Sequence, residues 1–170
     1  MKMYTNNIQG WIRGKALDFL YNEAQKHKSI LEIGSWKGKS TVALLEGTKG
    51  KVTAVDYFKG SGCGDETHKA TGIYEEFLKN TKQFENLRTL KMSSYEASEK
   101  LKGEKFDMIF IDADHSYESV KQDIQLWKDR ATKIICGDDY NQAWKGVIRA
   151  VNEEFNKIDL IESIWLIRKC

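Results

Sequence analysis

Residues 29–41 read SILEIGSWKGKST. The first five are mostly apolar, as in a buried β-strand, and a polar loop with Gly34 and Gly38 follows before a segment with helical spacing. Glycine lets the backbone turn sharply and come close to a ligand. A strand, a glycine-containing loop and a helix in this order are typical of α/β proteins that bind nucleotides, so this stretch predicts that fold class.

Outward from this stretch, short apolar runs alternate with helical patterns. Strands are predicted at SILEIG (29–34), KVTAVD (51–56), NLRTLKM (86–92), FDMIFIDA (106–113) and KIICGDD (133–139). The last two are almost continuously apolar, as expected for parallel strands covered on both faces. Residues 157–169 have room for two more strands joined by a tight connection. We therefore predict a Rossmann-like, doubly wound α/β sheet of about seven strands, mostly parallel, with an antiparallel C-terminal edge and helices on both faces.

Apolar residues at spacings of three and four predict the helices. Helices are expected at about 8–26, within 41–45, at 74–84, from Val120 to Trp127 and from Trp144 to Phe155. We interpret the apolar stripes of the last two as core packing rather than a ligand surface. For 170 residues we predict a single domain over 1–170, with the N-terminal helix at about 8–26 and the sheet core at about 29–170.

The composition excludes several classes of function. The 27 basic and 25 acidic residues give a net charge of only +2, so we expect no binding to nucleic acid or to an anionic membrane. No apolar run reaches the ~20 residues of a membrane helix and the N-terminus has no apolar signal segment, so a cytoplasmic protein is expected. Cys63, Cys136 and Cys170 form no CxxC pair, which favours reduced thiols. The sequence leaves open whether the chain forms a homo-oligomer.

Three nucleotide-binding interpretations compete for the loop at Gly34. The dinucleotide pattern GxGxxG fails, because Trp36 and Lys39 stand where its second and third glycines belong. The phosphate-loop pattern GxxxxGK(S/T) is imitated by Gly38, Lys39 and Ser40, but one residue is missing before Gly38. The third interpretation is an adenosyl ligand without phosphates, which needs no phosphate cradle.

Two acidic residues favour the third interpretation. Glu32 ends the first strand and can face a ligand that carries an ammonium and a sulfonium. Asp56 ends the second strand, at about the separation from which a carboxylate accepts both ribose hydroxyls in such folds. The competing possibility is that Glu32 caps backbone groups and Asp56 begins a turn. The segment that follows, 58–72, is rich in glycine and polar residues and is expected to be a long mobile loop that closes over a ligand.

Four further carboxylates meet at the same rim of the predicted sheet. Asp112 and Asp114 end the fourth strand, and Asp138 and Asp139 end the fifth. Carboxylates this close repel one another unless a cation or a proton offsets their charge, so a hard ion such as Mg²⁺ or Ca²⁺ is a natural partner. The alternative is that Asp114 caps the next helix and the others bond backbone or cofactor. His115 follows directly and can accept a proton from a hydroxyl, or else bond the helix start.

The motifs together resemble the class I S-adenosylmethionine-dependent methyltransferases, and among them the bacterial macrocin O-methyltransferase-like group. The resemblance rests on IQGWIRGKALDFL (8–20), LEIGSWKGKST (31–41), AVDYFKG (54–60), FIDADHSYESVKQDIQLW (110–127) and GDDYNQAWKGVIRAVNEEF (137–155). It implies that the methionine pocket is shaped by Glu32, Gly34, Ser35, Trp36 and Gly38. It also implies that Asp56 holds the ribose, that Ser93 or Ser94 lies near the adenine, and that Asp112 contacts the cofactor and takes part in catalysis.

The predicted activity is O-methylation of a small hydroxylated molecule. In metal-dependent relatives the ligands stand at positions that resemble Asp112, Asp138 and Asp139, and His115 would be the base. Two alternatives stay open. A phosphate-loop-like nucleotide hydrolase would bind magnesium-ATP through Lys39, and a non-catalytic adenosyl-binding module would bind the cofactor without turnover.

Overall fold

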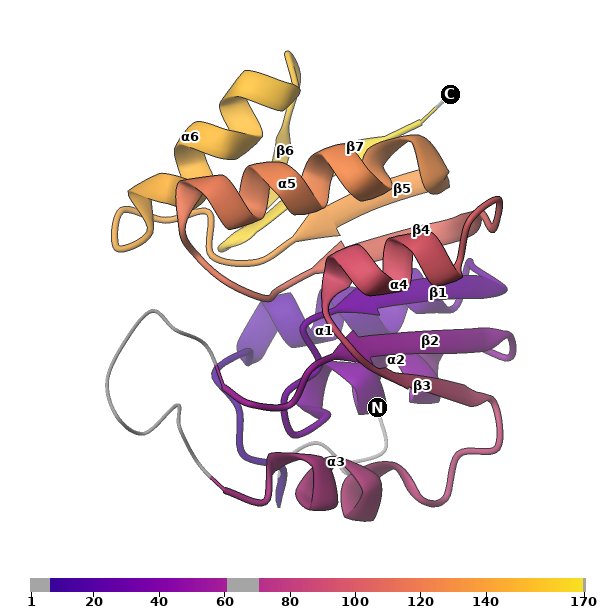
Figure 1. Ribbon diagram of the computed structural model, residues 1–170. Helices are drawn as coiled ribbons and strands as arrows, with labels where there is room; N and C mark the ends of the chain where they lie inside the picture. The colour runs from indigo at the N-terminus through magenta and orange to yellow at the C-terminus, as the bar shows by residue number, and fades with distance from the viewer. Residues whose placement is uncertain (1–6, 61–70, 170) are drawn as a thin grey trace.

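The computed structural model describes residues 7–60 and 71–169 (Figure 1). Its sheet has seven strands in the order β3-β2-β1-β4-β5-β7-β6. The strands are β1 (Ser29–Ile33), β2 (Lys51–Asp56), β3 (Leu87–Lys91), β4 (Phe106–Ile111), β5 (Ala131–Gly137), β6 (Asp159–Ile161) and β7 (Ile164–Arg168). The first five pair in parallel, whereas β7 is antiparallel to β5 and to β6. The predicted Rossmann-like sheet with an antiparallel C-terminal edge is confirmed.

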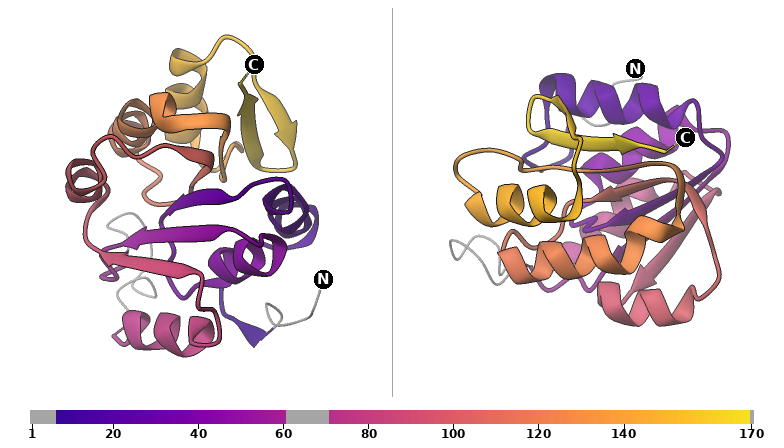
Figure 2. Two further views of the ribbon diagram at one scale, coloured as in Figure 1. Left: turned by 90° about the vertical axis from the view of Figure 1, so that its right-hand side faces the viewer. Right: turned by 90° about the horizontal axis from the view of Figure 1, so that it is seen from above.

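Helices cover both faces of the sheet (Figure 2). They are α1 (Gly14–Ala24), α2 (Lys39–Gly47), α3 (Ile73–Thr81), α4 (Ser94–Lys100), α5 (Tyr117–Trp127) and α6 (Lys145–Glu154), with a short 3₁₀ helix at Lys128–Arg130. Side chains of a strand alternate between faces, so Leu31 and Ile33 pack with α4, α5 and α6 while Ile30 packs with α1 and α2. The predicted burial of β4 and β5 on both faces follows from these two layers.

The N-terminal helix is shorter than the sequence predicted. It begins at Gly14 rather than near residue 8, because Arg13 is extended and Gly14 has a φ of +58°, which interrupts a helix. Ile8 and Ile12 are buried, but Trp11 is 59% exposed, so helical spacing there did not mean a helix. The segment before Gly14 instead runs irregularly beside the loop that follows β1.

Helix α4 was not predicted, although the sequence contains its signal. Ser93 is the N-cap: its hydroxyl accepts from the Glu96 N–H, and the Glu96 carboxylate accepts from the Ser93 N–H. This reciprocal pair is a capping box, recognisable as Ser-x-x-Glu. The predicted mobile loop, by contrast, falls mainly at 61–70, which lies outside the described residues.

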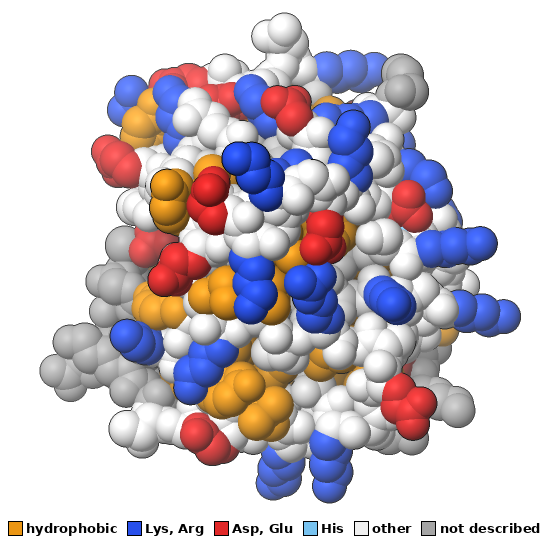
Figure 3. All heavy atoms as spheres, turned by 45° about the vertical axis from the view of Figure 1, so that its right-hand side comes forward, with side chains coloured by type: hydrophobic (Ala, Val, Ile, Leu, Met, Phe, Trp, Pro, Cys, Tyr) orange, Lys and Arg blue, Asp and Glu red, His pale blue; other side chains and the backbone are white. Residues whose placement is uncertain are grey.

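The surface carries both signs of charge. Lys and Arg side chains lie among Asp and Glu side chains over the face drawn in Figure 3, as expected from the small net charge. Within the residues that the structure describes, no helix is long and apolar enough to cross a membrane.

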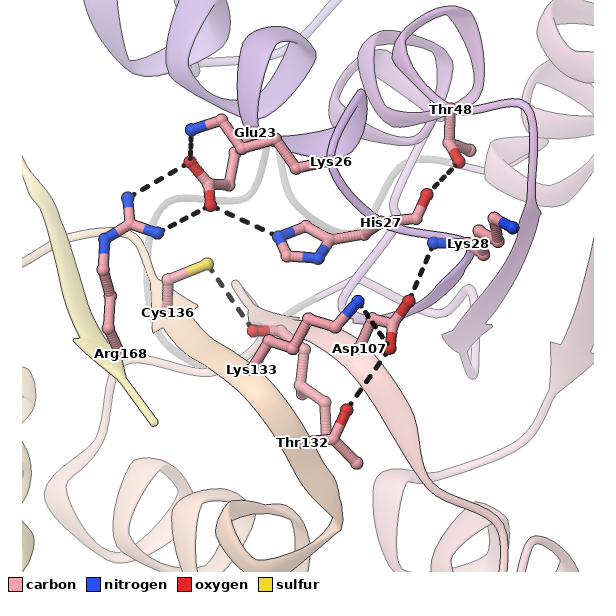
Figure 4. A network of polar contacts seen from close by, with 11 residues as sticks. Glu23, Lys26, His27, Lys28, Thr48, Asp107, Thr132, Lys133, Cys136 and Arg168 are labelled. Atoms are coloured by element: carbon pink, nitrogen blue, oxygen red, sulfur yellow. Dashed lines mark hydrogen bonds and ion pairs between the residues drawn. The ribbon is translucent and has the colours of Figure 1, made fainter. Parts of the chain in front are cut away.

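A polar network joins the C-terminal end of α1 to β7 (Figure 4). Glu23, only 2% exposed, accepts two hydrogen bonds from the Arg168 guanidinium at 2.8 and 3.2 Å and one from Lys26 at 2.8 Å. His27 Nε2 lies 3.2 Å from the Oε1 atom of Glu23. Burial raises the pKa of Glu23, but its bonds to His27, Arg168 and Lys26 outweigh that effect and hold the pKa far below its usual range. The network therefore fastens the first helix to the antiparallel edge.

Replacing Glu23 with alanine is expected to lower the free energy of unfolding by about 1–3 kcal/mol. The loss of unfolding free energy is no larger because the Arg168 and Lys26 side chains are more than half exposed. Water can therefore solvate them once Glu23 is gone. Urea unfolding at neutral pH measures the change. Asp18→Asn, an exposed change on the same helix, is the control, and equal stability of the two variants would contradict the role of the network.

Candidate active site

One cavity of about 640 Å³ lies at the carboxyl ends of the parallel strands. Its walls include the segments after four strands, at 34–36, 92–95, 112–115 and 138–139, together with Asp56 at the end of β2. This is the edge at which ligands bind in open α/β sheets. Of the site residues predicted from the sequence, all except Glu32 and Gly38 line this cavity.

The loop after β1 needs glycine for two different reasons. At Gly34, a side chain's Cβ would lie 2.0 Å from the Asp112 carbonyl oxygen, so only glycine lets the ends of β1 and β4 come this close. At Gly38, the N-cap of α2, the φ is +89°, in the left-handed region that favours glycine. Gly38 is covered by Phe77 and therefore shapes the loop rather than the cavity wall.

Asp56 holds the loop from the neighbouring strand. One carboxylate oxygen accepts from the N–H groups of Ser35 (2.9 Å) and Trp36 (2.8 Å), and the other accepts from the Phe58 N–H (2.5 Å). Burial raises the pKa of Asp56, and these three bonds oppose the rise. A carboxylate has about four acceptor positions, so Asp56 keeps one for a ligand in the cavity.

Glu32 lies beneath the loop instead of facing the cavity. It is on the same face of β1 as Ile30, is 0% exposed, and accepts hydrogen bonds from the Ser35 hydroxyl (2.7 Å) and the Thr41 hydroxyl (2.5 Å). Its other oxygen has no hydrogen-bond partner. Burial raises the pKa of Glu32 to about 7, against the effect of its hydroxyl partners. Its position thus makes it a support for the loop and for the start of α2.

Lys37 of the loop and Lys39, the first residue of α2, both bind the N-terminal segment. Lys37 donates to the Gln9 side chain at 2.8 Å, and Lys39 donates to the Gly10 carbonyl at 3.2 Å. The same segment also contacts the loop through Trp11 and Trp36, whose ring centroids are 4.5 Å apart. Lys39 therefore closes one wall of the cavity through backbone contact, which is not the free lysine that a phosphate loop presents to a nucleotide.

Three of the predicted catalytic and metal-binding side chains converge on one point. Asp112, His115 and Asp139 each offer a ligand atom, and these atoms all lie within 4.8 Å of one another. His115 Nε2 lies 2.7 Å from a carboxylate oxygen of Asp139. Burial raises the pKa of Asp112 well above its usual value, and the charges of Asp138 and Asp139 raise it further. This group of carboxylates is therefore favourable for a cation or a proton.

Asp138 and Asp114 play more local parts. Asp138 accepts from the Ser163 hydroxyl (2.5 Å) and the Asp139 N–H (2.7 Å), so one of its oxygens is already engaged. Asp114 accepts from the Ser116 N–H at 2.7 Å, which forms a turn before α5. The N-cap of α5 is Ser116, whose side chain accepts from the Ser119 N–H, and not Asp114 as the alternative interpretation had it.

The Trp144 ring forms part of the cavity wall, a role that the sequence did not indicate. It stacks on the His115 ring with centroids 4.2 Å apart and 23° between the planes. Its helical spacing suggested core packing, and it does contact the core, but as the N-cap of α6 it also faces the cavity. His115 Nδ1 is buried and has no hydrogen-bond partner, so Nε2 is the nitrogen that meets the other site residues.

Comparison with known protein families identifies the family to which this chain belongs. A family model described as "Methyltransferase domain" matches residues 31–140, which span the glycine loop, the cavity and the acidic cluster. The chain belongs to this methyltransferase family. The resemblance to class I methyltransferases is thereby confirmed. A search of curated proteins found none that matches this sequence.

Solved structures with the same fold are methyltransferases at low sequence identity. An O-methyltransferase from Bacillus cereus in complex with SAH has a TM-score of 0.69 and 18% identity, covering 96% of this chain and 86% of its own. The O-methyltransferase NovP has a TM-score of 0.69 and 16% identity over 91% and 79%. An SAH-bound methyltransferase from Podospora anserina has a TM-score of 0.67 and 19% identity over 92% and 79%. At such identities the likeness establishes the fold.

Proposed function

We propose that this methyltransferase transfers a methyl group from S-adenosylmethionine to a hydroxyl of a small molecule. One observation carries the proposal: a single cavity is lined both by the glycine loop with Asp56 and by the pair of His115 and Asp139. A methyl donor and a hydroxyl acceptor need adjacent sites, because the transfer is a direct displacement. That the Bacillus cereus and NovP structures are O-methyltransferases supports the choice of oxygen as the acceptor atom.

The cavity fits an adenosyl ligand better than a nucleotide with phosphates. The N–H groups of Ser35 and Trp36, which a phosphate would need, are bound to Asp56. The remaining acceptor position of Asp56 suits a ribose hydroxyl. Carboxylates at the far end of the cavity would repel phosphates but tolerate a sulfonium.

The proposed reaction forms an O–C bond, breaks a C–S bond and transfers one proton. A lone pair of the acceptor oxygen forms the new O–C bond while the C–S bond breaks and its electron pair passes to sulfur, which yields S-adenosylhomocysteine. The hydroxyl proton passes to the pair of His115 and Asp139, in which Nε2 and the carboxylate lie 2.7 Å apart. Trp144 holds the imidazole plane by stacking, so the ring is already oriented before the acceptor binds.

A divalent cation fits the acidic cluster. Asp112 and Asp139 offer hard oxygen donors close to His115, and the mutual repulsion of the carboxylates would be offset by such a charge. When bound, Mg²⁺ would hold the acceptor oxygen and lower the pKa of its hydroxyl. Acceptor screens are therefore to be run in parallel with Mg²⁺ and with a chelator.

Calorimetric titration with S-adenosylmethionine, S-adenosylhomocysteine and magnesium-ATP tests the cofactor. We expect both adenosyl ligands to bind, and Asp56→Ala to weaken them by about 10- to 100-fold, because the ribose and the loop both lose a charged hydrogen-bond acceptor. Asp129→Asn, an exposed change outside the cavity, is the control. ATP binding without any adenosyl signal would contradict the proposal, and adenosyl binding without turnover on any acceptor would favour a non-catalytic module.

A further inference from the structure

One buried acid on the cavity wall, Asp123, takes no part in the proposed methyl transfer. Asp123 lies on α5, is 6% exposed, and lines the cavity beside Ser94, Ser119 and Gln122. Among the described residues it forms no ion pair with a lysine, arginine or histidine. A buried carboxylate without a cation is costly unless it accepts hydrogen bonds, so Asp123 needs donors from the protein or from a ligand.

Its protein partner is the Ser94 hydroxyl. The Trp127 indole N–H donates to Ser94 Oγ at 2.9 Å, which leaves the hydroxyl hydrogen of Ser94 free to point at Asp123. The chain of donors therefore runs from Trp127 through Ser94 to the carboxylate. Asp123 lines the cavity, so the acceptor positions that Ser94 does not fill are open to a ligand there.

The sheet order indicates which part of the cofactor would lie at Asp123. Strand β2, which ends at Asp56, lies between β1 and β3. If the amino-acid part of the cofactor lies along the loop after β1 and its ribose at Asp56, the base must extend toward 92–95 and α5. The lining there combines Met92 and Tyr95 with polar side chains, and Asp123 is its carboxylate on α5. A flat base with hydrogen-bond donors on its edge suits this end.

We propose that Asp123 selects the 6-aminopurine ring of the cofactor by accepting a hydrogen bond from its exocyclic amino group. The inference rests on the proposed S-adenosylmethionine function and adds a specificity-determining residue to it. An ionised carboxylate only accepts hydrogen bonds, so it attracts an amino group at C6 and repels the carbonyl oxygen that hypoxanthine carries there. Ser94 orients the carboxylate by donating to it, and Trp127 holds Ser94 in place by donating to its hydroxyl oxygen.

The test compares S-adenosylhomocysteine with S-inosylhomocysteine, which differ only in the group at C6 and the proton at N1. Calorimetry with the wild-type protein is expected to show at least ~10-fold tighter binding of the adenosyl ligand. Asp123→Asn keeps the shape and places an amide NH₂ within reach of a C6 carbonyl. In this variant the ratio of the two affinities should fall to about one or invert. Asp129→Asn removes an exposed acid just beyond α5 and should keep the wild-type ratio.

The ratio of the two affinities distinguishes a role of Asp123 in selectivity from a role in packing. A wild-type preference that collapses in Asp123→Asn but persists in Asp129→Asn supports the proposal. Equal weakening of both ligands by Asp123→Asn, with the ratio unchanged, would assign Asp123 to the packing of α5 against Ser94 and overturn it. If the wild-type protein binds neither ligand, the proposed cofactor fails and this inference with it, whereas wild-type binding of both with equal affinity overturns the selectivity alone.

Discussion

Replacing His115 with alanine is expected to lower kcat for methyl transfer by about 10²- to 10⁴-fold, the usual contribution of a positioned general base. The imidazole can accept a proton from a hydroxyl and is already held in place, by Asp139 on its edge and Trp144 on its face. The measurement is a single-turnover rate with the acceptor found by the screen and with saturating S-adenosylmethionine.

Two controls separate the chemical role of His115 from a structural one. The His115→Ala variant should bind S-adenosylhomocysteine as the wild type does, because the ring contacts Asp139 and Trp144 rather than the glycine loop or Asp56. Added imidazole should restore part of the rate, since it can occupy the space left beside Trp144. An unchanged kcat would remove His115 from the mechanism and leave Asp139 or Asp112 to accept the proton.

The sheet was predictable because its strands carry a strong local signal. The runs that form β4 and β5 are almost continuously apolar, as expected for strands covered on both faces. The edge at which the site lies followed from the topology, since the carboxyl ends of parallel strands meet. That rule alone brought Asp56, Asp112 and Asp139 into one cavity.

The place of Glu32 was harder to predict, because it depends on which face of β1 each side chain takes. Ile30 and Glu32 share the face under α1 and α2, and the Thr41 hydroxyl of α2 reaches Glu32 from there. The sequence shows that a carboxylate ends the strand, but not whether the helix covers it. A polar side chain on the buried face of a strand is therefore ambiguous until the helix is placed.

Trp11, Trp144 and Asp123 were missed for a related reason. Each lies in a segment with helical spacing, and such spacing predicts packing. Their contact with the cavity depends on tertiary arrangement: Trp11 leaves the helix because Gly14 interrupts it, and Trp144 reaches His115 from the start of α6. Asp123 of α5 meets Ser94 of α4, a residue that lies on a different helix and far from it in the chain. Local pattern carries no information on such pairs.

Substituting Glu32 with glutamine is expected to change how stability depends on pH. Burial raises the pKa of Glu32 from 4.5 to about 7, so between these values the folded protein holds a proton that the unfolded chain has lost. Stability must then fall as the pH rises through this window, because the folded state binds more protons. The full shift corresponds to about 3 kcal/mol, and glutamine, which does not titrate, removes it.

Urea unfolding at several pH values from about 5 to 8 measures the effect as a difference between the two proteins. The wild type should lose about 2–3 kcal/mol relative to Glu32→Gln across that range, whatever the absolute cost of the buried amide, since that cost is the same at every pH. Glu99→Gln, an exposed change on α4, should run parallel to the wild type. Parallel curves for Glu32→Gln would mean that Glu32 is ionised throughout, and that the Ser35 and Thr41 hydroxyls compensate its burial in full.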